Sequence, residues 1–452
     1  MTIVELIDAA PIHNIMGALA FNATKIIYVG TVSKEKYREQ YEGTIKRFFA
    51  AKGIENIETE YLQVIRNDFN DIKAKFEKIA EENPHCYFDI SGGEDVMLAV
   101  AGYIFLKNQN VHLYQVNPNT NRIYLFSNEP DRDGSVKTVK KSIAVDIRNS
   151  VEENMIAHGG KVVYDDVKRD ATHRWKYTVP FLNDLEVMWD ICCTQVIPNP
   201  NDDKKLSPTR LWNTVTIALY NLEMAKEKTD NPLEFILDTE KYKTHLNLNG
   251  GYYLLDKYLN LFEQKGLIKF GDTHSRERIH IIYKDEQVKL CLTKAGTILE
   301  MKTFLTCEAL ISDKFTDCMT GVTVDWDGIV HKEADPQSFL LMSKEEQEQI
   351  IEDTVNEIDI VLMKGAIPYF ISCKNGKFDA DELNKMYVVR DKFGKEYGRM
   401  IIVTTDFDKF TGGYTLEHLR QRAKDMGIDI IENVHEMTDE EFRSKLEAAL
   451  LR

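Results

Sequence analysis

The sequence lacks several features that would place it among membrane or secreted proteins. It contains no run of about 18 apolar residues, so no transmembrane helix is expected. Its opening residues, MTIVELIDAAPIHN, carry early acidic side chains and no basic stretch, unlike a secretory signal peptide. The seven cysteines include no CxxC pair, so we expect reduced thiols in a cytoplasmic protein.

Several common catalytic motifs are also missing. The absence of GxxxxGK[ST], HExxH and GxSxG argues against a P-loop NTPase, a zinc hydrolase and a serine hydrolase. The chain also lacks a net positive charge, because 73 acidic residues against 57 Lys and Arg give a formal net charge of -16. A protein that coats duplex DNA needs a basic surface, so this class is disfavoured. A nuclease stays compatible with the composition, since carboxylates can hold a divalent metal that supplies local positive charge.

Short apolar strands alternate with helices through residues 1–128. Such alternation predicts a parallel, doubly wound, Rossmann-like sheet, because parallel strands need crossover helices. Residues 131–170 are charged and show no clear periodicity. We assign residues 1–150 to a first α/β domain.

The middle and last thirds of the chain differ from each other in pattern. Residues 196–208, VIPNPNDDKKLSP, are expected to form a linker or loop. Residues 209–294 predict two helices followed by a two-stranded ribbon, which resembles a winged-helix arrangement. A small packing or dimerisation domain is the alternative, because no basic recognition helix stands out. We assign 151–295 to this middle region. From 296 to 452 the alternation returns and predicts a second α/β domain, in which residues 344–357 read as an acidic helix leading into a strand.

The stretch NEIDIVLMKGAIPYFISCKNG places polar residues at alternate positions within two apolar runs. Residues i and i+2 of a strand share a face, so Glu357 lies with Asp359, and Ser372 lies with Lys374. The glycine and proline between the runs predict a hairpin. One reading is a salt-bridged, half-exposed hairpin. The other is a site for phosphodiester hydrolysis, in which carboxylates hold a divalent ion and a lysine stabilises the developing charge.

This hairpin resembles the active site of the PD-(D/E)xK restriction-endonuclease-like fold. Asp359 matches the first acid and Lys374 the lysine, whereas Ser372 stands where the second acid is expected. The resemblance implies Mg²⁺ or Mn²⁺ bound by Asp359 and by a carboxylate from elsewhere, with the Cys373 carbonyl as a further candidate ligand. The candidate carboxylates are Glu308, Asp325 and Asp327, of which the last two are expected on one strand face.

A second motif, FDISGGEDVMLAVAGYIF, reads as a strand, a Ser-Gly-Gly turn and a helix. Glycines allow close backbone approach to a ligand, and a helix N-terminus offers free N–H groups to an anion. GTVSKEKY follows another strand in the same way. Ligands of doubly wound sheets bind outside the carboxyl ends of strands, so both segments point to one crevice. A simple connection between elements is the alternative for each turn.

These two segments resemble the ligand-binding motifs of CARF domains, which sense cyclic oligoadenylates across a homodimer interface. The resemblance implies that the ligand contacts Thr31, Ser33, Ser91, Gly92 and Gly93. Glu94 departs from the usual pattern, because an acidic side chain beside an anionic ligand must accept hydrogen bonds from ribose or adenine. Lys34 or Lys36 would offset its charge.

The two motifs together resemble one family, the CRISPR-ancillary proteins that join a CARF sensor to a PD-(D/E)xK nuclease. This resemblance implies a homodimer, activated by a cyclic oligoadenylate such as the tetra-adenylate, that cleaves DNA or RNA in type III CRISPR antiviral defence. A ligand-responsive nucleic-acid-binding regulator with a degenerate, non-cleaving C-terminal domain is the alternative. A stand-alone restriction-type endonuclease is a third reading.

Overall fold

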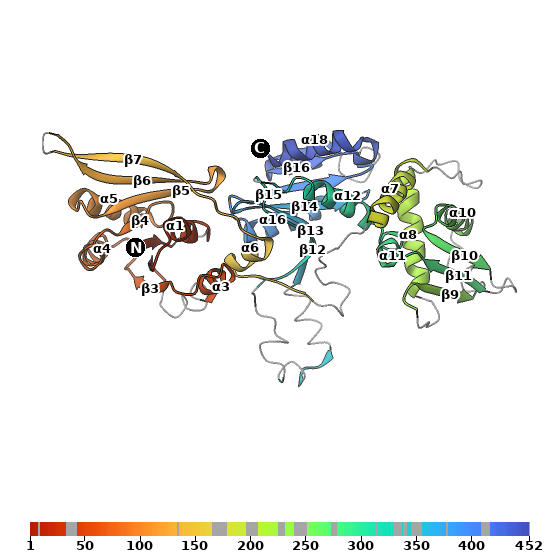
Figure 1. Ribbon diagram of the computed structural model, residues 1–452, viewed down its shortest axis with the longest axis horizontal. Coiled ribbons are helices and arrows are strands. Elements are labelled where there is room, and N and C mark those ends of the chain that lie inside the picture. The colour runs from red at the N-terminus through yellow and green to blue at the C-terminus, as the bar shows by residue number, and fades with distance from the viewer. Residues whose placement is uncertain are drawn as a thin grey trace. The chain divides into compact units, whose positions relative to one another are not determined.

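The computed structural model places most of the chain in helices and strands (Figure 1). It describes residues 1–7, 10–32, 43–132, 135–164, 179–195, 207–224, 231–238, 251–272, 278–312, 314–326, 328, 337, 341–344, 355–376, 378–407 and 416–451. The chain divides into two compact units. The first contains Met1–His173, Ile311–Phe370 and Met386–Arg399, and the second contains Arg174–Leu310, Ile371–Lys385 and Met400–Arg452.

A seven-stranded sheet organises the N-terminal region, in the order β3-β2-β1-β4-β5-β6-β7. Neighbours among β1 to β5 pair in parallel, and β6 and β7 pair antiparallel. The order reverses direction between β1 and β4, as in a Rossmann-like sheet. The predicted doubly wound domain is therefore confirmed. Its strands are β1 (Thr2–Leu6), β2 (Lys25–Gly30), β3 (Glu58–Gln63), β4 (Tyr87–Asp89), β5 (His112–Asn117), β6 (Arg122–Pro130) and β7 (Val136–Ala144).

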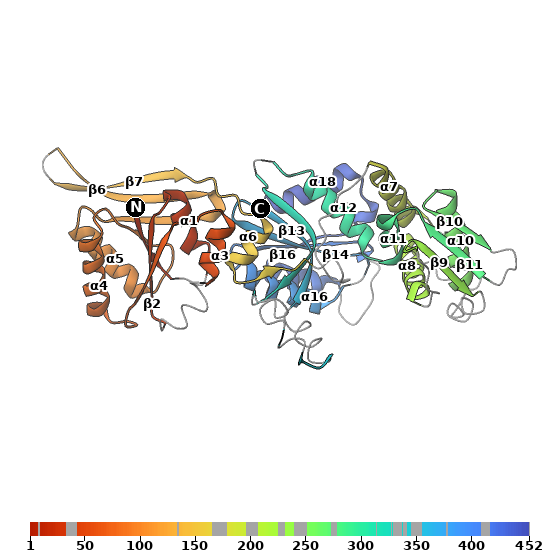
Figure 2. The ribbon, with the colours of Figure 1, turned by 60° about the horizontal axis from the view of Figure 1, so that its bottom comes forward.

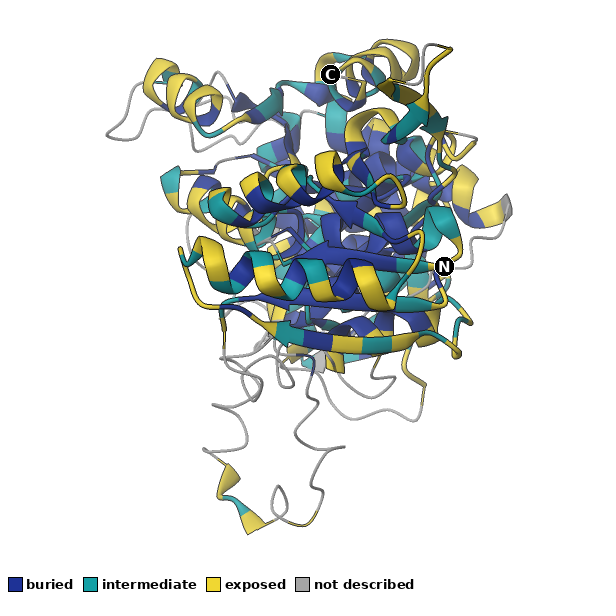
Figure 3. Cartoon of the chain, turned by 90° about the vertical axis from the view of Figure 1, so that its left-hand side faces the viewer, coloured by how far each residue is buried: buried dark blue, intermediate teal, exposed yellow. Residues whose placement is uncertain are grey.

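Two separate hydrophobic cores lie on the two faces of this sheet. Ile3 of β1 belongs to the core that contains Phe48, and the next residue, Val4, belongs to the core that contains Phe76. Neighbouring strand residues point to opposite faces, so a sheet covered on both sides needs consecutive apolar residues. The four covering helices, which Figure 2 shows on the two sides of the sheet, are α1 (His13–Phe21), α3 (Gly43–Ala51), α4 (Phe69–Glu82) and α5 (Asp95–Lys107). Figure 3 shows helices with exposed residues on their outer side and buried strands beneath. Helix α1 differs, because none of its residues is exposed.

Residues 131–170, which show no clear periodicity, contain β7, α6 (Val151–Ala157) and β8 (Lys161–Val162). The nine residues of β7 are mostly exposed and pair with β6 from Val136 to Ala144. An edge strand with both faces exposed to solvent shows no alternation of apolar and polar residues, so a hydrophobic pattern does not reveal its backbone pairing. Helix α6 begins with a capping box between Ser150 and Glu153, a signal that the sequence did carry.

The middle region contains a three-stranded antiparallel sheet in the order β10-β11-β9, together with helices. The expected helices and ribbon are present, and β9 adds a third strand to the ribbon. Buried Trp212 packs edge-on against Phe262 in this region. The elements are α7 (Val179–Thr194), α8 (Pro208–Met224), β9 (Glu234–Asp238), α10 (Gly251–Gln264), β10 (Ile268–Asp272), β11 (Arg278–Tyr283) and α11 (Glu286–Thr293). Residues 196–206 of the expected linker lie outside the described residues.

A six-stranded mixed sheet, ordered β16-β15-β14-β13-β12-β8, forms the predicted C-terminal α/β domain. Its short edge strand β8 comes from far upstream in the sequence and pairs with the end of β12. The strands after β8 are β12 (Asp317–Asp325), β13 (Val355–Lys364), β14 (Ile367–Lys374), β15 (Arg399–Thr404) and β16 (Ile428–Ile431). The helices are α12 (Thr297–Glu308), α16 (Ala380–Phe393), α17 (Leu416–Asp425) and α18 (Asp439–Leu450).

The helix expected at 344–357 is wrong for its last three residues, because β13 begins at Val355. Val355 pairs with Asp325, and Glu357 pairs with Thr323, so the β12 ladder overrides the helical pattern here. Residues 345–354 lie outside the described part of the chain. None of the helices within the described ranges is long and apolar enough to cross a membrane.

Candidate active site and ligand site

A cluster of three polar side chains lies where β14 ends and α16 begins. Ser372 Oγ donates a hydrogen bond to Glu382 Oε1 at 2.8 Å, and Lys374 Nζ lies 3.2 Å from the same oxygen. Ser372 and Lys374 therefore share one face of β14, as their spacing predicted. Ser372 is 6% exposed, and every residue of β14 except the last, Lys374, is buried. These polar side chains therefore lie in a part of the sheet that is largely shielded from water.

Glu382 is the residue that the sequence reasoning missed. It occupies the first turn of α16, whose preceding Asp379 accepts a hydrogen bond from the Asp381 N–H at 3.0 Å. A carboxylate in the first turn interacts favourably with the helix dipole. An acid at the start of the helix that follows an SxK strand was the available signal, but only the fold shows that it reaches that strand.

Glu357 and Asp359 both lie on β13, two residues apart, as expected. Glu357 is exposed, and Asp359 is half-buried. The main-chain oxygen of Asp359 accepts a hydrogen bond from Thr320 Oγ1 at 3.1 Å, which anchors this part of β13 to β12. In the sheet order β13 stands next to β14.

The carboxylates suggested as metal ligands lie in different surroundings. Glu308 is exposed at the last residue of α12. Asp325 is 4% exposed at the end of β12, and its Oδ1 accepts a hydrogen bond from the Gly328 N–H at 3.1 Å. Strand β12 ends at Asp325, and Asp327 lies outside the described residues. Among the residues that the structure describes, no group of three or more His, Cys, Asp or Glu side chains is placed to hold a metal.

The two expected ligand loops meet through Thr31 and Glu94. Thr31 follows β2, and its Oγ1 donates to Glu94 Oε1 at 3.2 Å. Arg66 Nε lies 3.3 Å from the same oxygen. The carboxylate that looked out of place beside an anionic ligand therefore has a cationic partner, which the sequence reasoning also missed. Ser33 lies outside the described residues.

Ser91 and Gly93 shape the loop after β4. Ser91 Oγ donates to Asp89 Oδ1 at 2.5 Å and accepts from the Val116 N–H at 2.7 Å, so this hydroxyl ties β4 to β5. Gly92 is buried. Gly93 has φ +95°, and a Cβ there would lie 2.6 Å from Leu6 Cβ, so no side chain fits.

A buried carboxyl pair lies directly beneath this loop. Glu5 on β1 and Asp89 on β4 are both 0% exposed, and Tyr114 Oη donates to Glu5 Oε1 at 2.8 Å. Burial raises the pKa of Asp89 to about 6, and burial together with the Asp89 charge raises the pKa of Glu5 well above its usual range. The charge of His13 acts in the opposite direction and lowers the pKa of Asp89. The Nε2 atom of His13 lies 2.6 Å from Tyr397 Oη.

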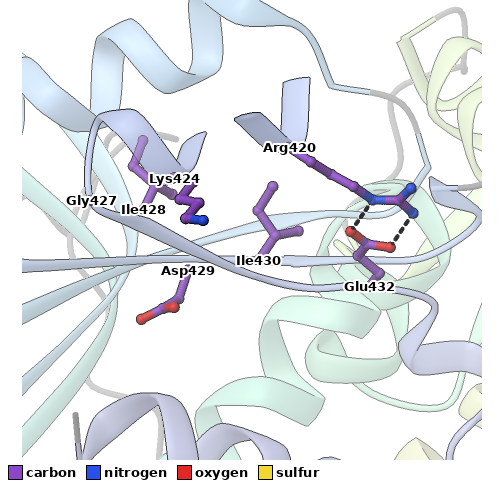
Figure 4. Close-up of a pocket in the computed structure, with 7 residues that line it drawn as sticks. All are labelled: Arg420, Lys424, Gly427, Ile428, Asp429, Ile430 and Glu432. Atoms are coloured by element: carbon purple, nitrogen blue, oxygen red, sulfur yellow. Dashed lines mark hydrogen bonds and ion pairs between the residues drawn. The ribbon is translucent and has the colours of Figure 1, made fainter. Parts of the chain in front are cut away.

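The C-terminal domain contains a pocket (Figure 4). It lies beside α17 and β16, and Arg420 bridges both carboxylate oxygens of Glu432 at 2.8 and 2.6 Å. Its lining residues are Arg420, Lys424, Gly427, Ile428, Asp429, Ile430 and Glu432. None of the residues singled out from the sequence lines it.

The two α/β domains define the class of fold that the sequence predicted, a Rossmann-like α/β domain followed by a second α/β domain. Two solved structures share this fold over nearly the whole chain. VC1899 from Vibrio cholerae matches with a TM-score of 0.65 and 15% identity, covering 99% of this chain and 98% of that one. Can2 from Sulfobacillus thermosulfidooxidans, solved in complex with cyclic tetra-adenylate (cA4), matches with a TM-score of 0.62 and 13% identity, covering 100% and 97%. No family model and no curated protein matches the sequence.

Proposed function

We propose that this chain is a cyclic oligoadenylate-activated, metal-dependent endonuclease of type III CRISPR antiviral defence. The observation that carries the proposal is the match to the cA4 complex of Can2, which extends over the whole of this chain. A match of that extent includes both the loops at the N-terminal sheet and the strands that carry Asp359 and Lys374. The likeness therefore supports one protein in which a sensor and a nuclease act together.

The ligand that we propose is cA4, bound at the carboxyl ends of β2 and β4. Thr31, Gly92 and Gly93 would line the site, with Ser33 in the same loop. Ser91 would hold the loop in place without contacting the ligand, because its hydroxyl is hydrogen-bonded to Asp89 and Val116. A four-fold repeated ring suits a two-fold symmetric site, so we propose an isologous homodimer around it.

The metal that we propose is Mg²⁺ or Mn²⁺, held by Asp359 with help from Glu308, Asp325 or Asp327. Mg²⁺ keeps several waters and binds through one or two carboxylates, so the lack of a three-residue group among the described residues still fits such a site. When bound, the ion polarises the phosphate and lowers the pKa of a bound water. Lys374 would supply positive charge at the phosphate. Glu357 would add a second carboxylate on β13 at the exposed edge of the site.

Activation would follow from a ligand-dependent population shift. A ligand that binds one conformation more tightly shifts the equilibrium toward it by its differential affinity. Cleavage that requires cA4 therefore demands that binding and catalysis couple within one dimer.

A cleavage assay tests the proposal. Supercoiled plasmid and labelled single-stranded RNA are incubated with Mn²⁺, with and without cA4, beside Asp359→Ala and the exposed control Asp391→Ala. We expect ligand-dependent cleavage by the wild type and the control, and a loss on the order of 100-fold in Asp359→Ala. Cleavage that persists in Asp359→Ala, or that ignores cA4, would refute the mechanism.

A second candidate function is a ligand-responsive regulator that binds nucleic acid without cleaving it. The helices and three-stranded sheet of the middle region support it, as does the serine at position 372. The regulator must bind DNA in EDTA and leave it intact, whereas the nuclease must be inactive in EDTA. A gel-shift and cleavage assay on the same sample separates the two.

A further inference from the structure

We propose that Glu382 supplies the second carboxylate of the nuclease site, from helix α16 instead of from strand β14. This inference rests on the proposed nuclease function and deepens it. The motif expects an acid at position 372, where the chain has a serine. The structure brings the Glu382 carboxylate to that serine.

The contacts place the carboxylate at the required position on the strand face. Ser372 Oγ donates to Glu382 Oε1 at 2.8 Å, so the Glu382 carboxylate lies just beyond the end of the short serine side chain. Lys374 Nζ lies 3.2 Å from the same oxygen, which reproduces the acid–lysine neighbourhood of an acid-x-lysine strand. A carboxylate offers roughly four lone-pair sites, so these two contacts leave capacity for a divalent ion.

Burial and charge also suit an ion-binding role. The Glu382 side chain is 16% exposed and that of Lys374 is 28% exposed. A carboxylate so far withdrawn from water needs compensation, which Lys374, Ser372 and the α16 dipole supply. Asp381, its neighbour in the same helical turn, is exposed and therefore offers a matched control.

The competing explanation is that Glu382 only orients Lys374. Both roles predict that Glu382→Gln lowers cleavage, so that measurement alone does not decide. A ligand role predicts that the carboxylate can be relocated to β14, whereas an orienting role does not.

The first test is relocation of the acid. Cleavage with Mn²⁺ and cA4 is compared for wild type, Glu382→Gln, Ser372→Asp with Glu382→Gln, and Asp381→Asn. We expect Glu382→Gln to lose on the order of 100-fold, the double variant to recover about tenfold, and Asp381→Asn to match the wild type. Full cleavage by Glu382→Gln overturns the inference and leaves the nuclease function standing.

The second test measures Mn²⁺ binding by calorimetry, without substrate, and needs no inserted acid. Glu382→Gln is made in the wild type and in Lys374→Met. A ligand role predicts a loss of about tenfold or more in Mn²⁺ affinity in both backgrounds. A loss confined to the background that retains Lys374 assigns Glu382 to lysine orientation and overturns the inference. If the wild type binds Mn²⁺ but cleaves nothing, the nuclease function fails, and this titration still decides the role of Glu382.

Discussion

The two ends of the chain place an acidic residue at the start of a helix, but they partner it differently. Glu94 precedes α5 and faces Arg66, whose side chain is 74% exposed. Glu382 lies in the first turn of α16 and faces Lys374, which is 28% exposed. A solvent-screened pair contributes little to stability and opens at little cost, whereas a sheltered pair is costly to separate. The difference indicates a displaceable ion pair at Glu94, beside the proposed ligand loops, and a fixed ion pair between Glu382 and Lys374 at β14.

The two sites also differ in which atoms do the work. At the proposed ligand loops the decisive features are the backbone of Gly93, with its positive φ, and the short Ser91 side chain, whose hydroxyl is turned inward to Asp89. At β14 and α16 the decisive features are side chains that regular elements project toward one another. Sites on rigid elements hold side chains more accurately than loops do, which suits chemistry.

The largest effect is expected from Gly93→Ala, which should abolish ligand binding by the N-terminal domain and leave metal binding by the C-terminal domain intact. An added Cβ would lie 2.6 Å from Leu6 Cβ at φ +95°, so strain of roughly 1–3 kcal/mol and a shifted loop are expected. We predict a lower Tm and loss of cA4 binding by calorimetry, with Mn²⁺ binding retained. Gly102→Ala in α5 is the control, because a Cβ there meets nothing within 4 Å. Tight cA4 binding by Gly93→Ala would contradict the assignment of this loop.

A smaller effect, on the pH dependence of stability, is expected from Asp89→Asn. Asp89 has a folded-state pKa of about 6 against an ordinary 3.8, so the folded state holds its proton longer as pH rises. Its contribution to stability is present below pH 3.8 and is lost as pH rises toward 6, by about 3 kcal/mol. Asparagine does not titrate, so the variant does not lose this stability. Its Tm relative to that of the wild type should therefore rise as pH increases from 3.8 to 6.

Other ionisable groups in this cluster remain in both proteins, and Asp89→Asn removes the Asp89 charge that helps to raise the pKa of one of them, Glu5. They are Glu5 on β1, His13 on α1 and Tyr114 on β5. A constant Tm difference between wild type and Asp89→Asn from pH 4 to pH 7 would show that Asp89 does not titrate there.

The smallest effect is expected from Arg66→Ala. Because Arg66 is largely exposed, its pair with Glu94 should add at most about 1 kcal/mol, and Tm should barely change. Loss of a cation near an anionic ligand should weaken cA4 binding by up to about fivefold, more at low salt than at high salt. Glu94→Gln should act in the opposite direction. Equal salt dependence in all three proteins would contradict an electrostatic role for this pair.

Much of the fold could be predicted because core elements repeat apolar residues at the period of a strand or helix. The alternation of strands and helices in residues 1–128 and 296–452 and the hairpin of β13 and β14 were indicated in this way. The edge strand β7 was missed, because two exposed faces leave no such period. The segment at 355–357 was assigned to a helix, because its acidic pattern does not reveal the β12 ladder that makes it a strand.

The sequence by itself determined that two α/β domains share one chain, and it placed Thr31, Gly93, Ser372 and Lys374 on the loops and strand where they lie. Local patterns suffice for these residues, since each belongs to a motif that is contiguous in the chain. Only the tertiary structure decided that Glu382 meets Ser372 and Lys374, that Arg66 meets Glu94, and that Glu5 meets Asp89. These pairs depend on which strand ends and helix starts become neighbours, and that adjacency is set by packing and not by any period of the sequence.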